Sequence, residues 1–98
     1  MEAATVREHA QAHGEAVATG DLRRASADLA DDAKAEAGAV MGRLPKPVRG
    51  AELVDVEASG GDDCVARIRY TGDGDDVTVE TRWREQDGRP KIVALTVL

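Results

Sequence analysis

Apolar residues recur at helical spacing along the first part of the chain. Within residues 3–19 they are Val6, Ala10, Gly14 and Val17. This period predicts a helix with a narrow apolar face over that segment. Gly20 favours the end of the helix, and Asp21 is a suitable N-cap for a second one. A third helical pattern covers 33–44 and ends before Pro45, because proline disfavours the helical conformation in the residue before it.

The helical period gives way to alternation after Gly50. The β-like runs are Ala51–Ala58, Cys64–Tyr70, Val77–Arg84 and Lys91–Leu98. The links between them are rich in Gly and Asp and are too short for crossover connections, so neighbouring strands must be antiparallel. The pattern therefore predicts an α+β fold in which three N-terminal helices pack on a four-stranded antiparallel meander.

The second and third runs can be aligned with each other residue by residue. A turn at Gly74 gives the pairs Cys64–Trp83, Ala66–Thr81, Ile68–Val79, Tyr70–Val77 and Arg67–Glu80. This register places apolar side chains opposite apolar ones and an arginine opposite a glutamate. We expect the helices to cover the apolar face of this pair of strands.

The fourth run is apolar on both faces. Val93, Leu95 and Val97 alternate with a second apolar row of Ile92, Ala94 and Leu98. Only one row can face the helices in a regular strand, so the other is left on the outside. An exposed apolar row is typical of an association surface, and it predicts a homodimer formed through the sheet.

The composition fits one small domain with few large side chains for its core. The chain has 98 residues, including one Tyr, one Trp and no Phe. This length predicts a single domain over 1–98, with helices in 3–44 and the sheet in 51–98. Ala, Val, Leu and Ile must supply most of the buried surface, and a core of this kind favours self-association.

Charge and cysteine content exclude several classes of partner. The net charge is −6, with no concentration of Lys and Arg that would suit phosphate groups. We therefore expect neither nucleic acid nor a membrane as a partner. No apolar run approaches the length that spans a bilayer, and the first residues lack the pattern of a signal peptide. Cys64 is the only cysteine, so the expected location is cytoplasmic.

Three groups of residues carry possible chemistry of their own. His9 and His13 share one helix face and can hold a metal only with a third ligand from elsewhere, so exposed histidines are the favoured interpretation. The acidic loop around Asp73 lacks the pattern of a calcium-binding loop and is better explained as a solvated turn. Cys64 alternates with apolar residues and is expected to be a buried thiol. The sequence thus predicts no metal, no cofactor and no catalytic constellation.

Three other residues are candidates for the wall of a ligand pocket. Tyr70 and Trp83 are the only aromatic residues and lie on the predicted inner face of the sheet. They can line a pocket between sheet and helices, or they can simply fill the core. Asp55 alternates with valines; it either projects into such a pocket as a general base or lies on the solvated face.

The order of elements resembles the nuclear transport factor 2-like (cystatin-like) superfamily. A helix, the Gly20-Asp21 turn, a second helix and an Asp31-Asp32 pair are similar to the opening of those domains. Arg82-Trp83-Arg84 and the segment 87–92 are similar to their final hairpin. The resemblance implies a curved sheet wrapped by helices into a cone, often dimeric through the sheet. It also implies a missing strand, because residues 30–39 have a helical pattern here, and hence a shallower cone.

Two functions remain open on these grounds. The first is a non-catalytic domain, homodimeric, that binds a protein partner or a small apolar ligand. The second, implied by the resemblance, is an isomerase or cyclase of the ketosteroid isomerase or polyketide cyclase type. The sequence favours the first, because no acid–base pair of such enzymes can be matched to residues of this chain.

Overall fold

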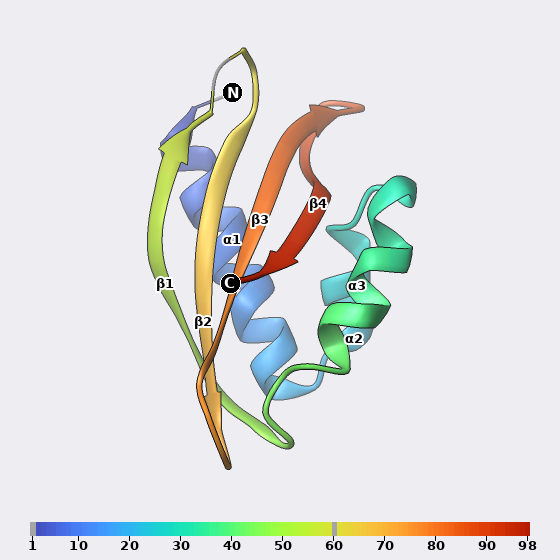
Figure 1. Cartoon of the computed structure of the whole chain (residues 1–98). Coiled ribbons are helices and arrows are strands. Elements are labelled where there is room, and N and C mark those ends of the chain that lie inside the picture. Colours follow the sequence, from blue (N-terminus) through green and yellow to red (C-terminus); the bar gives the residue numbers. More distant parts are fainter. Residues whose placement is uncertain (1, 60) are drawn as a thin grey trace.

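The computed structural model describes residues 2–59 and 61–98. Its helical elements are α1 (Ala3–Thr19), α2 (Leu22–Ala27), the short 3₁₀ helix η1 (Asp31–Ala33) and α3 (Lys34–Met41). Its strands are β1 (Val48–Ala58), β2 (Cys64–Gly72), β3 (Val77–Gln86) and β4 (Arg89–Val97). The chain has the α+β order expected from the sequence, with the helices first and an antiparallel sheet after them (Figure 1).

Helix α1 ends where the sequence predicts. Gly20 adopts a left-handed conformation with φ of 80°, and its N–H reaches carbonyl groups in the last turn of the helix. The Asp21 carboxylate then accepts a hydrogen bond from the Arg24 N–H at 3.2 Å and caps α2. The predicted third helix over 33–44 is shorter in the structure, because residues 31–33 form η1 and α3 ends at Met41.

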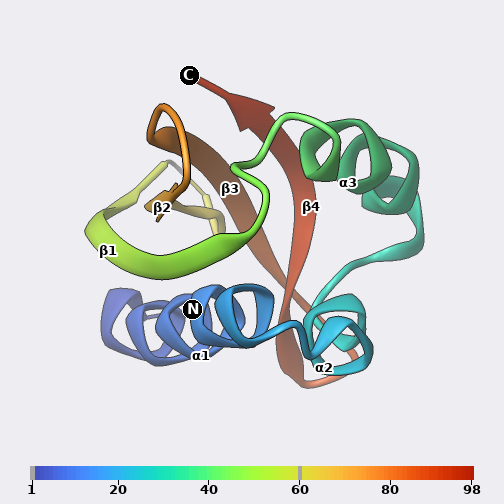
Figure 2. The ribbon, with the colours of Figure 1, turned by 90° about the horizontal axis from the view of Figure 1, so that it is seen from below.

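The sheet is a meander in the order β1-β2-β3-β4, and every neighbouring pair is antiparallel. The predicted register of β2 and β3 is confirmed at each of its pairs, from Cys64–Trp83 to Tyr70–Val77. Strand β1 begins at Val48 rather than Ala51, so it is longer than predicted. Figures 1 and 2 show that the strands bend and twist along their length.

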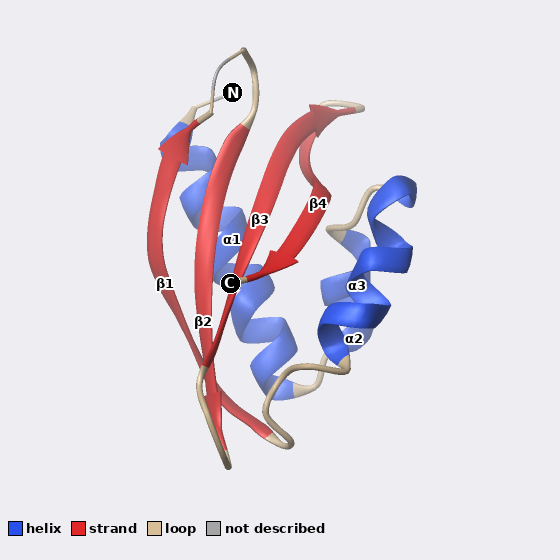
Figure 3. Ribbon diagram, in the orientation of Figure 1, coloured by secondary structure: helices blue, strands red, loops and turns tan. Residues whose placement is uncertain are grey.

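All three helices lie on one side of the sheet (Figure 3). Helix α1 packs against β1 and β2, whereas η1 and α3 lie beside β4. Trp83, Ile68, Ile92 and Val6 are among the largest fully buried side chains and join these layers into one core. Among the described residues, no helix is long and apolar enough to cross a membrane.

The two apolar rows predicted for the fourth run are interrupted in β4 by a β-bulge. The register shifts between Arg82 and Trp83, so that Ile92 pairs with Trp83 while Ala94 pairs with Arg82. Val93 is therefore the extra residue of a β-bulge, which changes the face on which later side chains lie. Ile92 and Leu95 both become buried. The bulge removes most of the outer apolar row on which the predicted sheet dimer rested.

The outer face of the sheet is charged. Arg67 donates to Asp55 at 3.0 Å, to Glu57 at 2.8 Å and to Glu80 at 3.1 Å. The hydrogen bonds to Glu57 and then to Asp55 raise the pKa of Arg67 above its ordinary value. Asp55 and Glu57 are more than half exposed, so their ion pairs contribute little to stability, but the network makes this face an unfavourable surface for apolar association.

Candidate functional site

A pocket of about 340 Å³ lies between the helices and the inner face of the sheet. Most of its lining is aliphatic. The lining residues are His13, Val17, Leu22, Ala25, Ser26, Leu29, Lys34, Ala37, Gly38, Val40, Met41, Leu44, Tyr70, Val79, Thr81 and Leu95. All three α-helices and three of the four strands contribute to it, so the pocket depends on the complete fold.

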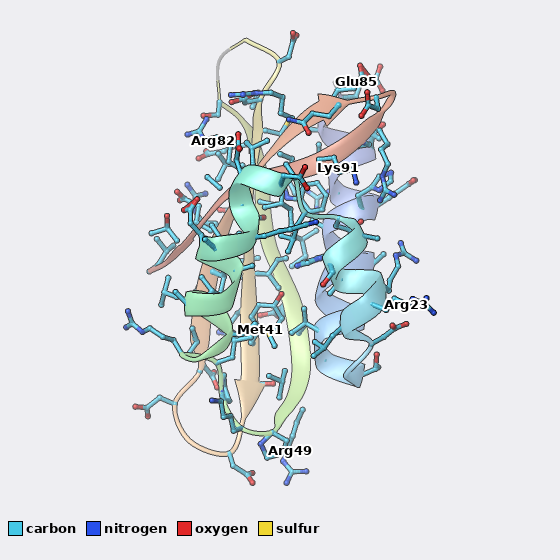
Figure 4. All side chains as sticks on the ribbon, turned by 90° about the vertical axis from the view of Figure 1, so that its right-hand side faces the viewer. Arg23, Met41, Arg49, Arg82, Glu85 and Lys91 are labelled. Carbon is cyan, nitrogen blue, oxygen red and sulfur yellow. The ribbon has the colours of Figure 1, made fainter. Side chains whose placement is uncertain are left out.

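Exposed apolar side chains border the mouth of the pocket. Leu22 on α2 is 50% exposed and Met41 on α3 is 37% exposed, although both are large and apolar. Figure 4 shows Met41 at the lower end of α3. The same two side chains, with Val17 and Leu44, also line a shallower apolar hollow that extends toward Pro45. The mouth therefore offers apolar surface to an entering molecule.

His13 is the main polar group of the pocket wall, and it is buried. It projects from the third turn of α1 and only 5% of its surface is exposed. Its Nδ1 atom lies 3.1 Å from Oδ2 of Asp28. Its ring is nearly perpendicular to the Trp83 ring, with an interplanar angle of 87° and 6.1 Å between the ring centroids. These contacts fix the orientation of the imidazole.

Asp28 is completely buried and is bonded from several sides. Besides His13, its carboxylate binds Arg89, whose Nη2 donates to Oδ1 at 2.8 Å. Its backbone carbonyl accepts from the Ile92 N–H at 2.7 Å, and the Ala30 N–H donates to the Ile92 carbonyl at 2.8 Å. This short parallel pairing ends α2 at Ala27 and joins the helices to the free edge of β4.

Tyr70 supplies a second polar group to the pocket wall. The side chain is 3% exposed and comes from the inner face of β2. No hydrogen bond of its hydroxyl group is found among the described residues. Burial raises the pKa of this hydroxyl well above its ordinary value of 10.0, so it stays protonated at neutral pH and can donate to a ligand.

The ionisation of Tyr70 is directly measurable, because it is the only tyrosine. We expect the tyrosinate absorbance of the folded protein to rise only well above pH 10, and that of the urea-unfolded protein to rise near pH 10. Because the pKa is higher in the folded state, the free energy of unfolding should fall as pH rises above 10. Identical titration curves for the folded and unfolded chains would contradict the burial of this hydroxyl.

The three residues proposed from the sequence for the pocket wall are placed differently by the structure. Tyr70 lines the pocket. Trp83 does not line the pocket; it is fully buried beside His13. Nε1 of Trp83 donates a hydrogen bond to the Thr81 hydroxyl at 2.8 Å. Asp55 lies on the opposite face of the sheet, 51% exposed and paired with Arg67. Asp55 is therefore not a pocket residue.

The remaining sequence candidates are also placed. The sequence predicted that both histidines are exposed, but His13 is buried and His9 is half-buried. The centroid of the His9 ring lies 6.5 Å from that of the Trp83 ring. Within residues 2–59 and 61–98, no three His, Cys, Asp or Glu side chains lie close enough to hold a metal ion. Asp73 binds the exposed Arg49 guanidinium at 3.0 Å. Cys64 is buried, in agreement with its alternation pattern.

Sequence reasoning did not identify Asp28 or Arg89 as site residues. A signal for Asp28 was present, because it lies between Ala25 and Leu29 on a segment whose apolar spacing points those neighbours inward. An acid within such a stripe indicates a buried carboxylate with a partner. No comparable signal exists for Arg89, whose role depends on the contact of the last hairpin with a segment distant in the sequence.

Comparisons with known proteins do not place this chain in a family. No protein-family model matches it, and no match was found among curated proteins or solved structures.

Proposed function

We propose that this protein is a small-molecule-binding domain, and that its ligand is an apolar molecule held in the pocket between the helices and the sheet. The observation that carries the proposal is the pocket itself, which combines a mostly aliphatic lining with three buried polar side chains, those of His13, Tyr70 and Thr81. Ligand sites are typically apolar concavities with a few well-placed polar groups.

The size of the pocket indicates the size of the ligand. A volume of about 340 Å³ lies near the lower end of the range for ligand sites. It suits a molecule with one or two rings, or a short branched chain. Such a molecule would contact aliphatic side chains from α1, α3 and β4 and would place its polar group near His13.

Membership of the nuclear transport factor 2-like superfamily and a homodimer formed through the sheet are further proposals. Three helices followed by a four-stranded meander, with a pocket between them, support a short nuclear transport factor 2-like domain. A sheet-mediated homodimer has weaker support, because the bulge at Val93 buries much of β4 and the outer face carries the Arg67 network. A monomer at micromolar concentration in light scattering would contradict the dimer and leave the pocket unaffected.

Acid–base catalysis on the bound molecule is the second candidate function. The observation that favours it is the His13–Asp28 pair at the pocket wall, since a histidine oriented by a carboxylate is a common general base. In an isomerase or cyclase of this kind, His13 would move a proton and Tyr70 would donate to a carbonyl oxygen. Both candidates need the same bound ligand.

Binding of naphthalene, followed by NMR chemical-shift titration, tests the proposed function. Gly38 on α3 lines the pocket, and a Cβ atom placed there meets no other atom within 4 Å. A side chain at this position therefore starts in open space beside the pocket, and a phenylalanine ring there is designed to cover the mouth. We expect Gly38→Phe to weaken naphthalene binding about tenfold or more, equivalent to about 1.4 kcal/mol.

Gly38→Ala is the matched control for this variant. It adds only a methyl group and should leave naphthalene binding unchanged. It should also raise the free energy of unfolding by up to about 1 kcal/mol, because alanine is favoured over glycine within a helix. Failure of the wild-type protein to bind naphthalene, or equal binding by wild type and Gly38→Phe, would overturn the proposed site.

A further inference from the structure

The hydrogen bonds of Asp28 determine which nitrogen of His13 carries the proton. Arg89 can only donate, so the Asp28 oxygen that it binds must accept. A carboxylate beside a guanidinium is ionised, and its other oxygen also accepts. The His13 Nδ1 atom, 3.1 Å from that oxygen, must then be the donor. In the neutral imidazole this leaves Nε2 without a proton, as a hydrogen-bond acceptor.

The Nε2 atom of His13 is open to the pocket. It has no hydrogen-bond partner among the described residues. Among those residues, Nε of Arg89 is the one side-chain nitrogen or oxygen that is both fully enclosed and without a hydrogen bond, so Nε2 of His13 is not fully enclosed. Nε2 is thus in contact with accessible space, and His13 is one of the residues that line the pocket. The pocket therefore presents an acceptor from His13 and a donor from Tyr70.

We propose that Asp28 is a positioning residue that fixes the His13 proton on Nδ1, and that the pocket therefore selects apolar molecules carrying a weakly acidic hydroxyl group, a phenol or an enol. Such a hydroxyl donates to Nε2 of His13, and its oxygen can accept from the Tyr70 hydroxyl. An ether or a plain hydrocarbon leaves the acceptor unsatisfied in an apolar site. This inference rests on the proposed ligand pocket and adds the chemical class of the ligand.

A matched pair of probes tests the selection. 2-Naphthol and 2-methoxynaphthalene share the same rings, but only the first can donate a hydrogen bond. We expect 2-naphthol to bind the wild-type protein about tenfold more tightly, the effect of about one buried hydrogen bond. Equal affinities would overturn the proposed ligand class while leaving the proposed apolar site intact, whereas no binding of either probe or of naphthalene would count against the site itself.

Asp28→Asn tests the positioning role. The asparagine has the same shape, its oxygen can accept from Arg89, and its amide group then donates to Nδ1 of His13. The ring proton must move to Nε2, so the pocket acceptor becomes a donor. We expect the preference for 2-naphthol to disappear in this variant. Asp32→Asn, a change of an exposed acid, should keep it.

The ¹⁵N NMR signals of the His13 ring report the proton position without any ligand. We expect the unprotonated-nitrogen signal of the neutral ring to belong to Nε2 in the wild type and in Asp32→Asn, and to Nδ1 in Asp28→Asn. A merely structural role of Asp28 would not exchange these assignments. A wild-type signal showing the proton on Nε2 would overturn the positioning role, even if Asp28→Asn failed to fold.

Discussion

Replacement of Asp28 by alanine is expected to lower the free energy of unfolding by about 3 kcal/mol. The change removes a fully buried carboxylate and leaves Arg89 and His13 facing an empty space without their partner. Removing one member of a buried ion pair is strongly destabilising because the other charge stays desolvated. The head group of Arg89 is partly exposed, so the lower end of the usual range applies.

Urea unfolding of Asp28→Ala and of a control measures this loss. Asp32→Ala is the control, since Asp32 is exposed and its carboxylate makes no hydrogen bond or ion pair with other described residues. It should change the free energy of unfolding by no more than about 0.5 kcal/mol. If both variants were equally stable, Asp28 would not be the buried link between α1, the end of α2 and the last hairpin.

Replacement of Gly14 by valine is expected to lower the free energy of unfolding by about 2 kcal/mol. Gly14 lies on the face of α1 that packs against β1 and β2. A Cβ atom there would be 3.2 Å from the Ala51 Cβ atom and 3.2 Å from Cγ2 of Ile68. A branched side chain must therefore push α1 away from β1 and β2, because packed interiors have little free space.

Two further variants separate this packing effect from helix propensity. Gly14→Ala should be milder than Gly14→Val, since its single methyl group needs only a shift of a few tenths of an ångström. Glu15→Val places the same branched residue on the exposed side of α1 and should cost less than about 1 kcal/mol. Equal losses for Gly14→Val and Glu15→Val in urea unfolding would contradict the close approach of α1 to the sheet.

The parts of the fold that follow from local patterns were predictable. The end of α1 follows from Gly20 and Asp21, whose backbone and side chain satisfy the helix ends. The register of β2 and β3 follows from period-two alternation, because a slip by one residue would expose Ile68 and bury Arg67. The aromatic Tyr70 was a natural pocket candidate because alternation placed it on the inner face.

The remaining features depend on contacts between distant segments. The bulge at Val93 is not visible in an apolar run, and it decides that Ile92 and Leu95 share the buried face. A second register shift between Leu53 and Asp55 leaves Val54 exposed. The pairing of His13 with Asp28 joins α1 to the end of α2, and the pairing of Leu29 with Ile92 holds that end against β4. Periodicity indicates which face a residue is on, but not which partner it meets.

The most direct test of the pocket as a ligand site is an isotope-filtered NOE spectrum of the wild-type protein with bound naphthalene. We predict intermolecular NOEs to the methyl groups of Val17, Val79 and Leu95, which line the pocket from α1, β3 and β4. NOEs confined to exposed apolar side chains such as Val54 and Leu98 would contradict the account, because they would place the ligand outside the pocket.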